Sequence, residues 1–273
     1  MSGPVIHTRV AIALHTEHFF RGHRLFGELA GRESVTGLVA LAVSGRRLDP
    51  AACAMLDDLA VVTSVADPRI WPLKMSRVLA SYGSVVLGCF GASLCLEELI
   101  IGPWSGGLAA RWLSDLAGEL GPRVGDDDAV RDAVRQRLAR GERIPGFGVP
   151  LREFDERLVA LRACVERRGR SNGRHWALMD SVIRTVRDGQ GPEPNTNLGI
   201  AAVTLDLGFE PDEISPLMVF MSQILFIANA LEGAQQRSAF LRDMPREHVR
   251  YVGAPPRESP RALASRERVP ARR

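Results

Sequence analysis

Side chains that could do acid–base or metal chemistry gather near the start of the chain, at His15, Glu17, His18 and His23. Histidines three apart, with a third five residues further on, could hold a metal ion if this segment were helical. The simpler interpretation is a set of surface or partly buried histidines near the beginning of a domain. We therefore predict no metal site, and we keep His23 as a candidate catalytic residue.

Ser105 stands in the run Gly-Pro-Trp-Ser-Gly-Gly. A serine nucleophile needs a nearby histidine, and this run is not the Gly-x-Ser-x-Gly turn that presents such a serine. The only lysine, Lys74, lies outside any phosphate-loop pattern, and any Schiff base would have to use it. Gly83, Gly88 and Gly91 do not form a dinucleotide-binding Gly-x-Gly-x-x-Gly.

The four cysteines form no Cys-x-x-Cys pair and no ligand-like group with histidine, so buried reduced thiols are the simplest interpretation. Asp126, Asp127 and Asp128 stand just ahead of a predicted helix. Carboxylates at that position cap free N–H groups and face the positive end of the helix dipole. We interpret this acidic cluster as a cap rather than a metal site.

The net charge of +3 belongs to the end of the chain. Residues 254–273 hold six arginines and two glutamates, which gives +4 and leaves −1 for the rest. We predict a disordered, Pro-, Ser- and Arg-rich tail and no nucleic-acid partner. The first ten residues lack the pattern of a signal peptide, and the apolar run 214–231 contains enough polar residues to favour a buried core helix over a membrane span. We expect a cytoplasmic protein.

Apolar residues at helical spacing prevail, and they predict an all-α protein with a short extended segment near 4–14. Pairs such as Gly102-Pro103, Gly121-Pro122 and Glu210-Pro211 separate the predicted helices. The expected helices are 38–43, 51–65, 73–96, 107–120, 129–140, 154–168, 176–186, 199–207 and 215–232.

Seven segments, in the right order, resemble motifs of the citrate synthase and citryl-CoA lyase superfamily. The most specific is Ile-Pro-Gly-Phe-Gly-Val-Pro at 144–150, which resembles the family's PGFGHP loop, and Pro-Asn-Thr-Asn-Leu-Gly-Ile at 194–200 is similar to its PLNVDGAI run. The others are 20–29 for YRGYxIxEL, 38–50 for LLLxGxLP, 100–107 for LHGGA, 222–232 for SRxPGxxAHxLE and 251–253 for YxGP.

The resemblance implies a helical fold of two domains and a homodimer whose sites are completed across the interface. The large domain would comprise 1–130 and 204–253, and the small domain 131–203. It further implies a coenzyme A thioester as substrate, with no tightly bound cofactor. Gly106, Gly107, Gly146, Phe147 and Gly148 would let backbone N–H groups approach that thioester. Arg152, beside the loop, either meets the phosphates or is an ordinary surface arginine.

The resemblance also shows which catalytic groups are replaced. The family's Asp, which removes an α-proton, becomes Asn197, and the His that hydrogen-bonds the enolate becomes Ser105. The second catalytic His becomes Val149. The carboxylate-binding Arg becomes Gln223, and the His of AHxLE becomes Asn229. Asn197 cannot accept a proton at neutral pH, and Val149 has no polar atom. A working citrate synthase is therefore excluded.

Three further residues are candidates by position. His23 and the adjoining Arg24 belong to the segment that approaches the family's active site, and Arg246 is similar in place to an arginine that enters the neighbouring subunit. Two functions stay open. The protein is an enzyme repurposed in bacterial secondary metabolism for a less anionic acyl-CoA or carrier-bound acyl group, or it is a pseudoenzyme that binds, regulates or partners an active paralogue.

Overall fold

The computed structural model describes residues 5–64, 68–94, 102–149, 152–236, 246–254 and 259. Two units are distinguished, Met1–Arg237 and Ser238–Arg273. All the elements below belong to the first unit except the short helix Arg246–His248, which lies in the second. The predicted tail falls almost wholly outside the described residues.

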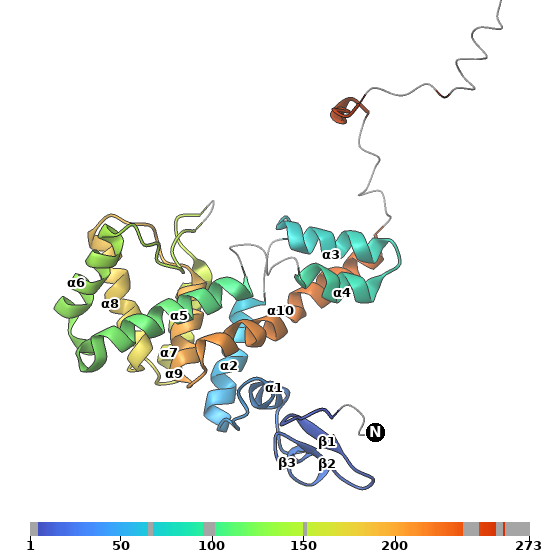
Figure 1. Cartoon of the computed structure of the whole chain (residues 1–273), viewed down its shortest axis with the longest axis horizontal. Coiled ribbons are helices and arrows are strands. Elements are labelled where there is room, and N and C mark those ends of the chain that lie inside the picture. Colours follow the sequence, from blue (N-terminus) through green and yellow to red (C-terminus); the bar gives the residue numbers. More distant parts are fainter. Residues whose placement is uncertain are drawn as a thin grey trace, which may run out of the picture. The chain divides into compact units, whose positions relative to one another are not determined.

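The N-terminal segment is a small antiparallel sheet (Figure 1) of β1 (Ala11–Ala13), β2 (His18–Phe20) and β3 (His23–Arg24), in that order. Arg21 and Gly22 form the turn between β2 and β3, both with positive φ, as tight hairpin turns require. A five-residue π-type turn, Leu25–Leu29, follows. The extended segment was predicted at 4–14, but it continues to residue 24, so the histidines do not share a helix face.

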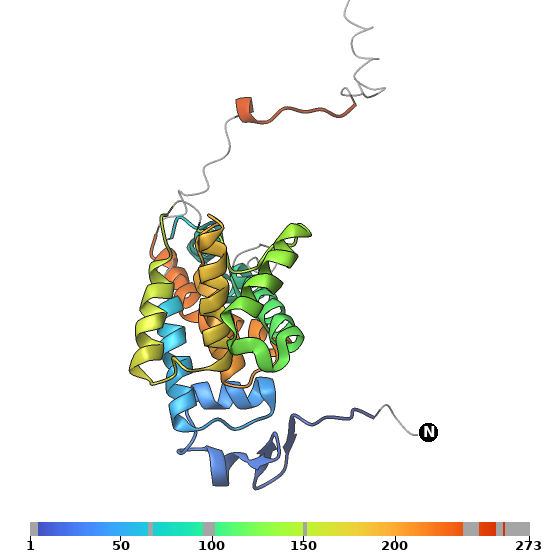
Figure 2. The same ribbon diagram turned by 90° about the vertical axis from the view of Figure 1, so that its left-hand side faces the viewer.

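The main core is helical. Its central helix, α9 (Thr196–Asp206), is buried along nearly its whole length. It packs against α5 (Pro103–Leu120), α7 (Glu156–Arg167) and α8 (Arg174–Asp188), and α6 (Asp127–Ala139) covers α8. Figure 2 shows these helices side by side. Each lies within a few residues of its predicted range, which confirms the all-α prediction.

Two further helices, α1 (Val35–Ser44) and α2 (Pro50–Thr63), contact the C-terminal long helix α10 (Pro211–Ala234). Within the described residues, α10 is the one helix long and apolar enough to cross a membrane by length and composition. It packs against α3 (Trp71–Ser81), α4 (Val85–Leu94) and α5 instead, as a core helix does. The prediction of a core helix for this apolar run agrees with that packing.

The sequence predicted one helix over 73–96, and this was wrong. The structure has α3 (Trp71–Ser81) and α4 (Val85–Leu94), which reverse at Gly83, where φ is +90°. The two helices lie close together because Gly88 has no side chain: a Cβ there would stand 2.8 Å from the Ser76 carbonyl oxygen. The Ser76 hydroxyl donates to the Gly88 carbonyl at 2.7 Å.

Two smaller predictions are confirmed. The Asp126 side chain accepts hydrogen bonds from the N–H groups of Asp128 and Ala129, so the acidic cluster caps α6. Three cysteines are free and buried, namely Cys53, Cys89 and Cys164. Cys95 lies outside the described residues.

Candidate functional site

The N-termini of α5 and α9 meet at a contact between Ser105 and Asn197. The side-chain amide of Asn197 donates to the Ser105 hydroxyl oxygen at 2.9 Å. Ser105 lies in the first turn of α5 and is 7 % exposed, and Asn197 lies in the first turn of α9. Helix N-termini favour negative charge, so this junction suits an oxygen on which charge develops.

Gly106 and Gly107 follow Ser105 but face different neighbours. A Cβ on Gly106 would lie 4.0 Å from Asn197 Oδ1, so its bare backbone borders the Ser105–Asn197 contact. A Cβ on Gly107 would stand 2.3 Å from Ser215 Oγ on α10. A Cβ on Gly107 would require the Ser215 side chain to turn away, whereas a Cβ on Gly106 would make ordinary van der Waals contact with Ile200 and Asn197.

The loop 144–149 is tied to the residues before α9. The N–H of Gly148 donates to the Glu193 carbonyl at 2.7 Å, and the N–H of Asn195 donates to the Gly146 carbonyl at 2.8 Å. The side-chain amide of Asn195 also donates to the Gly148 carbonyl at 3.1 Å. Phe147 forms an isolated bridge with Pro194. These bonds hold the loop beside Asn195, which lies two positions before Asn197.

Asp155 links this loop region to α9, and sequence reasoning missed it. Its carboxylate caps α7 through the Arg157 N–H, accepts the Thr196 N–H at 2.9 Å and pairs with the Arg157 guanidinium at 2.9 Å. Burial alone would raise the pKa of Asp155, but hydrogen bonds from the Arg157 guanidinium and the Thr196 N–H outweigh it and lower the pKa to about 2. An Asp in the first turn of the predicted helix 154–168 was the available signal.

The segments that meet at this site contain no ionisable side chain. Residues 102–107, 144–149 and 194–198 hold no Asp, Glu, His, Lys, Arg, Cys or Tyr. Glu97 and Glu98, which precede α5, lie outside the described residues. Among the described residues no three His, Cys, Asp or Glu side chains come together as metal ligands. These three segments are polar but uncharged.

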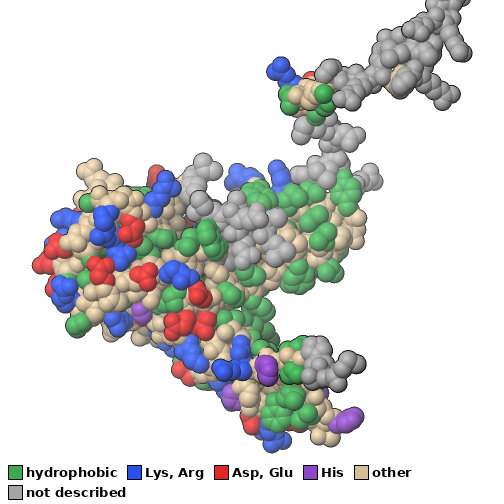
Figure 3. Space-filling view, viewed as in Figure 1, with side chains coloured by type: hydrophobic (Ala, Val, Ile, Leu, Met, Phe, Trp, Pro, Cys, Tyr) green, Lys and Arg blue, Asp and Glu red, His purple; other side chains and the backbone are tan. Residues whose placement is uncertain are grey.

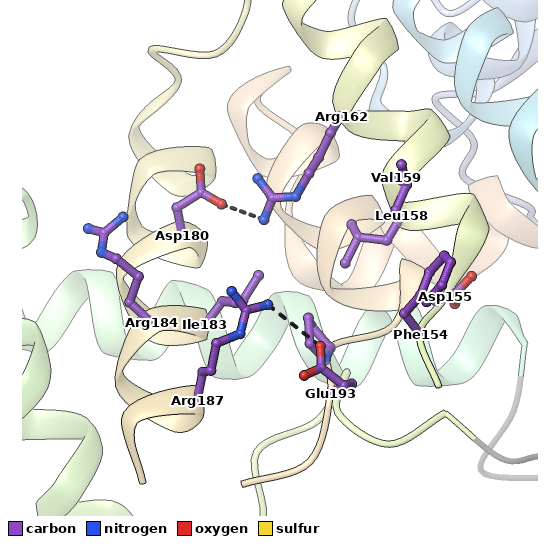
Figure 4. A pocket seen from close by; sticks show the side chains of 11 residues that line it. Phe154, Asp155, Leu158, Val159, Arg162, Asp180, Ile183, Arg184, Arg187 and Glu193 are labelled. Carbon is purple, nitrogen blue, oxygen red and sulfur yellow. Dashed lines mark ion pairs between the residues drawn. The ribbon is translucent and has the colours of Figure 1, made fainter. Parts of the chain in front are cut away.

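The cavity drawn in Figure 4 has a volume of about 330 Å³ and lies between α7 and α8. Leu158, Val159 and Ile183 supply apolar side chains, and Arg162 pairs with Asp180 at 2.6 Å. Its wall includes Asp155, Glu193 and Pro194, so the same residues that hold the loop and α9 also line this cavity.

Known structures share this architecture. Citryl-CoA lyase from Hydrogenobacter thermophilus superposes with a TM-score of 0.77 at 22% identity, covering 96% of this chain and 100% of that one. ATP citrate lyase from Methanothrix soehngenii, in complex with citrate and coenzyme A, gives 0.72 at 17%, covering 93% and 42%. Citrate synthase from Thermoplasma acidophilum, with carboxymethyl coenzyme A and oxaloacetate, gives 0.60 at 18%, covering 83% and 59%.

The chain has the citrate synthase-like fold. No protein-family model matches the sequence, and no curated protein matches it either. The fold predicted from the sequence is confirmed.

Within this citrate synthase-like fold, the other predicted site residues are dispersed. Gln223 donates to the Val219 carbonyl on its own helix, and its Oε1 is buried without a hydrogen-bond partner. Asn229 accepts from the Arg77 guanidinium at 3.0 Å, and Arg77 also pairs with Glu232 at 2.8 Å. Arg77 was not among the predicted residues. Asn229 therefore serves the packing of α10 on α3.

The charged candidates are engaged with nearby carboxylates. His23 pairs with Glu28 at 3.4 Å, and Arg24 pairs with Glu17 at 3.3 Å. No hydrogen bond or ion pair of the described residues joins this hairpin to Ser105 or Asn197. Arg152 pairs with Glu156.

The structure defines no role in the site for two of the predicted residues. Val149 is half-buried and follows Gly148 in the tied loop. Arg246 is exposed and begins the short helix of the second unit, so its part in the site stays a prediction.

Proposed function

We propose that the protein is an enzyme that makes, breaks or rearranges a carbon–carbon bond in an acyl thioester of coenzyme A. The contact between Ser105 and Asn197 carries this proposal, because the resemblance assigns to these positions the enolate donor and the α-proton base. The two residues are 92 positions apart, yet their side chains are hydrogen-bonded. The backbone of Gly106 borders this pair without a side chain of its own.

The substrate differs from that of a citrate synthase. A tricarboxylate needs cationic partners, and the segments around Ser105 and Asn197 supply none. Gln223 and Val149 replace groups that would carry charge. A positioned acid or base is worth about 10²–10⁴-fold, and the residues here offer neither. We therefore propose a less anionic acyl group, bound as a thioester of coenzyme A or of a carrier protein, in cytoplasmic bacterial metabolism.

A pseudoenzyme is the second candidate. The observation that favours it is the absence of an ionisable side chain from the three described segments of the site. Such a protein would bind a thioester, or a partner subunit, without turning it over.

We propose that the protein is a homodimer with a large domain (1–130 and 204–253) and a small domain (131–203). The face made by α3, α4 and α10 supports the dimer, since Figure 3 shows hydrophobic side chains spread over it. On α10 the exposed Phe220, Ile224, Ile227 and Leu231 recur at helical spacing. Val86, Leu87 and Phe90 of α4 are at least half exposed.

Calorimetric titration with coenzyme A, acetyl-CoA and longer acyl-CoAs tests the proposed function. We expect micromolar binding with a preference for one acyl group. Gly106→Val should abolish it by filling the space beside Asn197. Gly118→Val is the matched control, because Gly118 lies on the same helix with open space where its Cβ would be. Absence of binding at millimolar ligand would remove the coenzyme A thioester from consideration.

A further inference from the structure

We propose that the reactive electron pair at this site comes from the substrate itself, through loss of carbon dioxide from a thioester with a carboxylate on its α-carbon. The inference rests on the proposed acyl-thioester function and specifies its substrate class, a malonyl-type thioester.

The described residues of the site include no base that could remove a proton from the substrate. An enolate forms either when a base takes an α-proton or when an α-substituent leaves its bonding electrons behind. Asn197 and Ser105 are neutral groups with no useful basicity at neutral pH. Asp155 is the carboxylate bonded to the N-terminus of α9, but with a pKa of about 2 and hydrogen bonds to Thr196 and Arg157 it is a poor base. The second route needs no base.

The uncharged site also tolerates a carboxylate on the α-carbon of the substrate. An aspartate at position 197 would repel a carboxylate on the α-carbon, whereas the neutral Asn197 tolerates it. Val149 is half-buried and directly follows Gly148, whose carbonyl accepts a hydrogen bond from Asn195, so this part of the loop supplies an apolar residue and no charged one. A carboxylate in apolar surroundings loses solvation, and its departure as neutral carbon dioxide relieves that cost.

Negative charge develops on the thioester oxygen as the enolate forms, and Ser105 can donate a hydrogen bond to it. The Ser105 oxygen accepts the hydrogen bond from Asn197, so the Ser105 proton remains to be donated to the thioester oxygen. A donor aimed at that oxygen stabilises the enolate more than the ground-state carbonyl. Ser105 is thus a catalytic residue in this reaction, and Asn197 positions it.

The reaction balances without a co-reactant beyond water. The bond between the carboxyl carbon and the α-carbon breaks, and its electron pair forms the thioester enolate while carbon dioxide leaves. Water protonates the α-carbon, and the remaining hydroxide combines with carbon dioxide as bicarbonate. Malonyl-CoA would yield acetyl-CoA.

The test measures acetyl-CoA formed from malonyl-CoA by mass spectrometry. Succinyl-CoA is the matched control substrate, because its extra carboxylate is one carbon too far away to leave an enolate. Ser105→Ala should lower the turnover of malonyl-CoA by about 10²-fold with little change in its binding. Ser114→Ala, on the same helix, should leave turnover unchanged.

Calorimetry and deuterium exchange separate the inference from the proposed function. Binding of malonyl-CoA without decarboxylation overturns the inference and leaves the proposed function standing. Exchange of the acetyl-CoA methyl protons in heavy water also overturns it, since exchange requires a base. If no coenzyme A thioester binds at millimolar concentration, the proposed function itself fails. Decarboxylation without exchange supports both.

Discussion

Asn197 at the start of α9 donates a hydrogen bond of 2.9 Å to Ser105 at the start of α5. Both positions belong to runs that resemble active-site motifs, but an amide and a hydroxyl replace the expected carboxylate and imidazole. The contact joins the first turns of two helices and offers neither a base nor a cation. What the pair can still do is donate a hydrogen bond.

A carboxylate at position 197 should introduce proton removal. In Asn197→Asp the new side chain would accept the Ser105 hydroxyl proton and face the α-carbon of a bound acetyl-CoA. We expect the methyl protons of acetyl-CoA to exchange in heavy water with this variant and not with the parent protein, measured by mass spectrometry. Asn172→Asp, in the turn before α8, controls for an added carboxylate elsewhere. Equal exchange in both variants would contradict the assignment of position 197.

Asp155 should make stability depend on pH in the acid range. Its pKa is about 2 in the folded protein against 3.8 unperturbed, a difference worth about 2 kcal/mol. Because the folded pKa is the lower one, this stabilisation is complete above pH 4 and is lost as the pH falls towards 2. Asp155→Asn should cost about 2–3 kcal/mol at pH 7, measured by urea unfolding, and nearly nothing at pH 2.

Glu156→Gln is the control for that experiment. Glu156 neighbours Asp155 but is about half exposed, and it forms an ion pair with the exposed Arg152. Its replacement should change the free energy of unfolding by less than about 1 kcal/mol. A pH-independent loss in Asp155→Asn would show that the carboxylate charge is not what stabilises α7 and α9.

The sequence predicted the helical core well because apolar periodicity reports burial directly. It failed over 73–96, since Val85 to Leu94 continue the apolar pattern of α3 and only Gly83 marks the reversal. It also missed Asp155, whose importance depends on the approach of Thr196 from 41 positions away. Contacts of that kind follow from packing and leave little local trace in a single sequence.

Predicted site residues that were assigned in the same way had different outcomes. Ser105 and Asn197 were assigned by position in motifs that start helices, and the structure brings them together. Asn229 was assigned in the same way on α10, but Arg77 of α3 holds it. A helix position fixes a side chain's face only approximately, so the neighbouring helix decides which group it meets.

The loop 144–149 should tolerate a methyl group at one glycine and not at the other. Gly146 and Gly148 both have positive φ, of 86° and 99°. A Cβ on Gly146 would lie 2.7 Å from Leu198 Cβ, whereas one on Gly148 would meet nothing within 4 Å. We expect Gly146→Ala to cost about 2–5 kcal/mol and Gly148→Ala about 1–2 kcal/mol, measured by urea unfolding. Equal losses would mean that backbone strain alone matters.

The apolar face of α3, α4 and α10 should govern assembly. Phe90 is 55 % exposed on α4, so Phe90→Glu can fold as a single chain while placing a charge in the proposed dimer interface. We expect light scattering to show twice the 29.8 kDa chain mass for the parent protein and the single-chain mass for this variant. Val61→Glu, at a 68 % exposed position on α2, should remain dimeric. A parent protein that is already monomeric, or a Phe90→Glu variant that stays dimeric, would exclude this face as the interface.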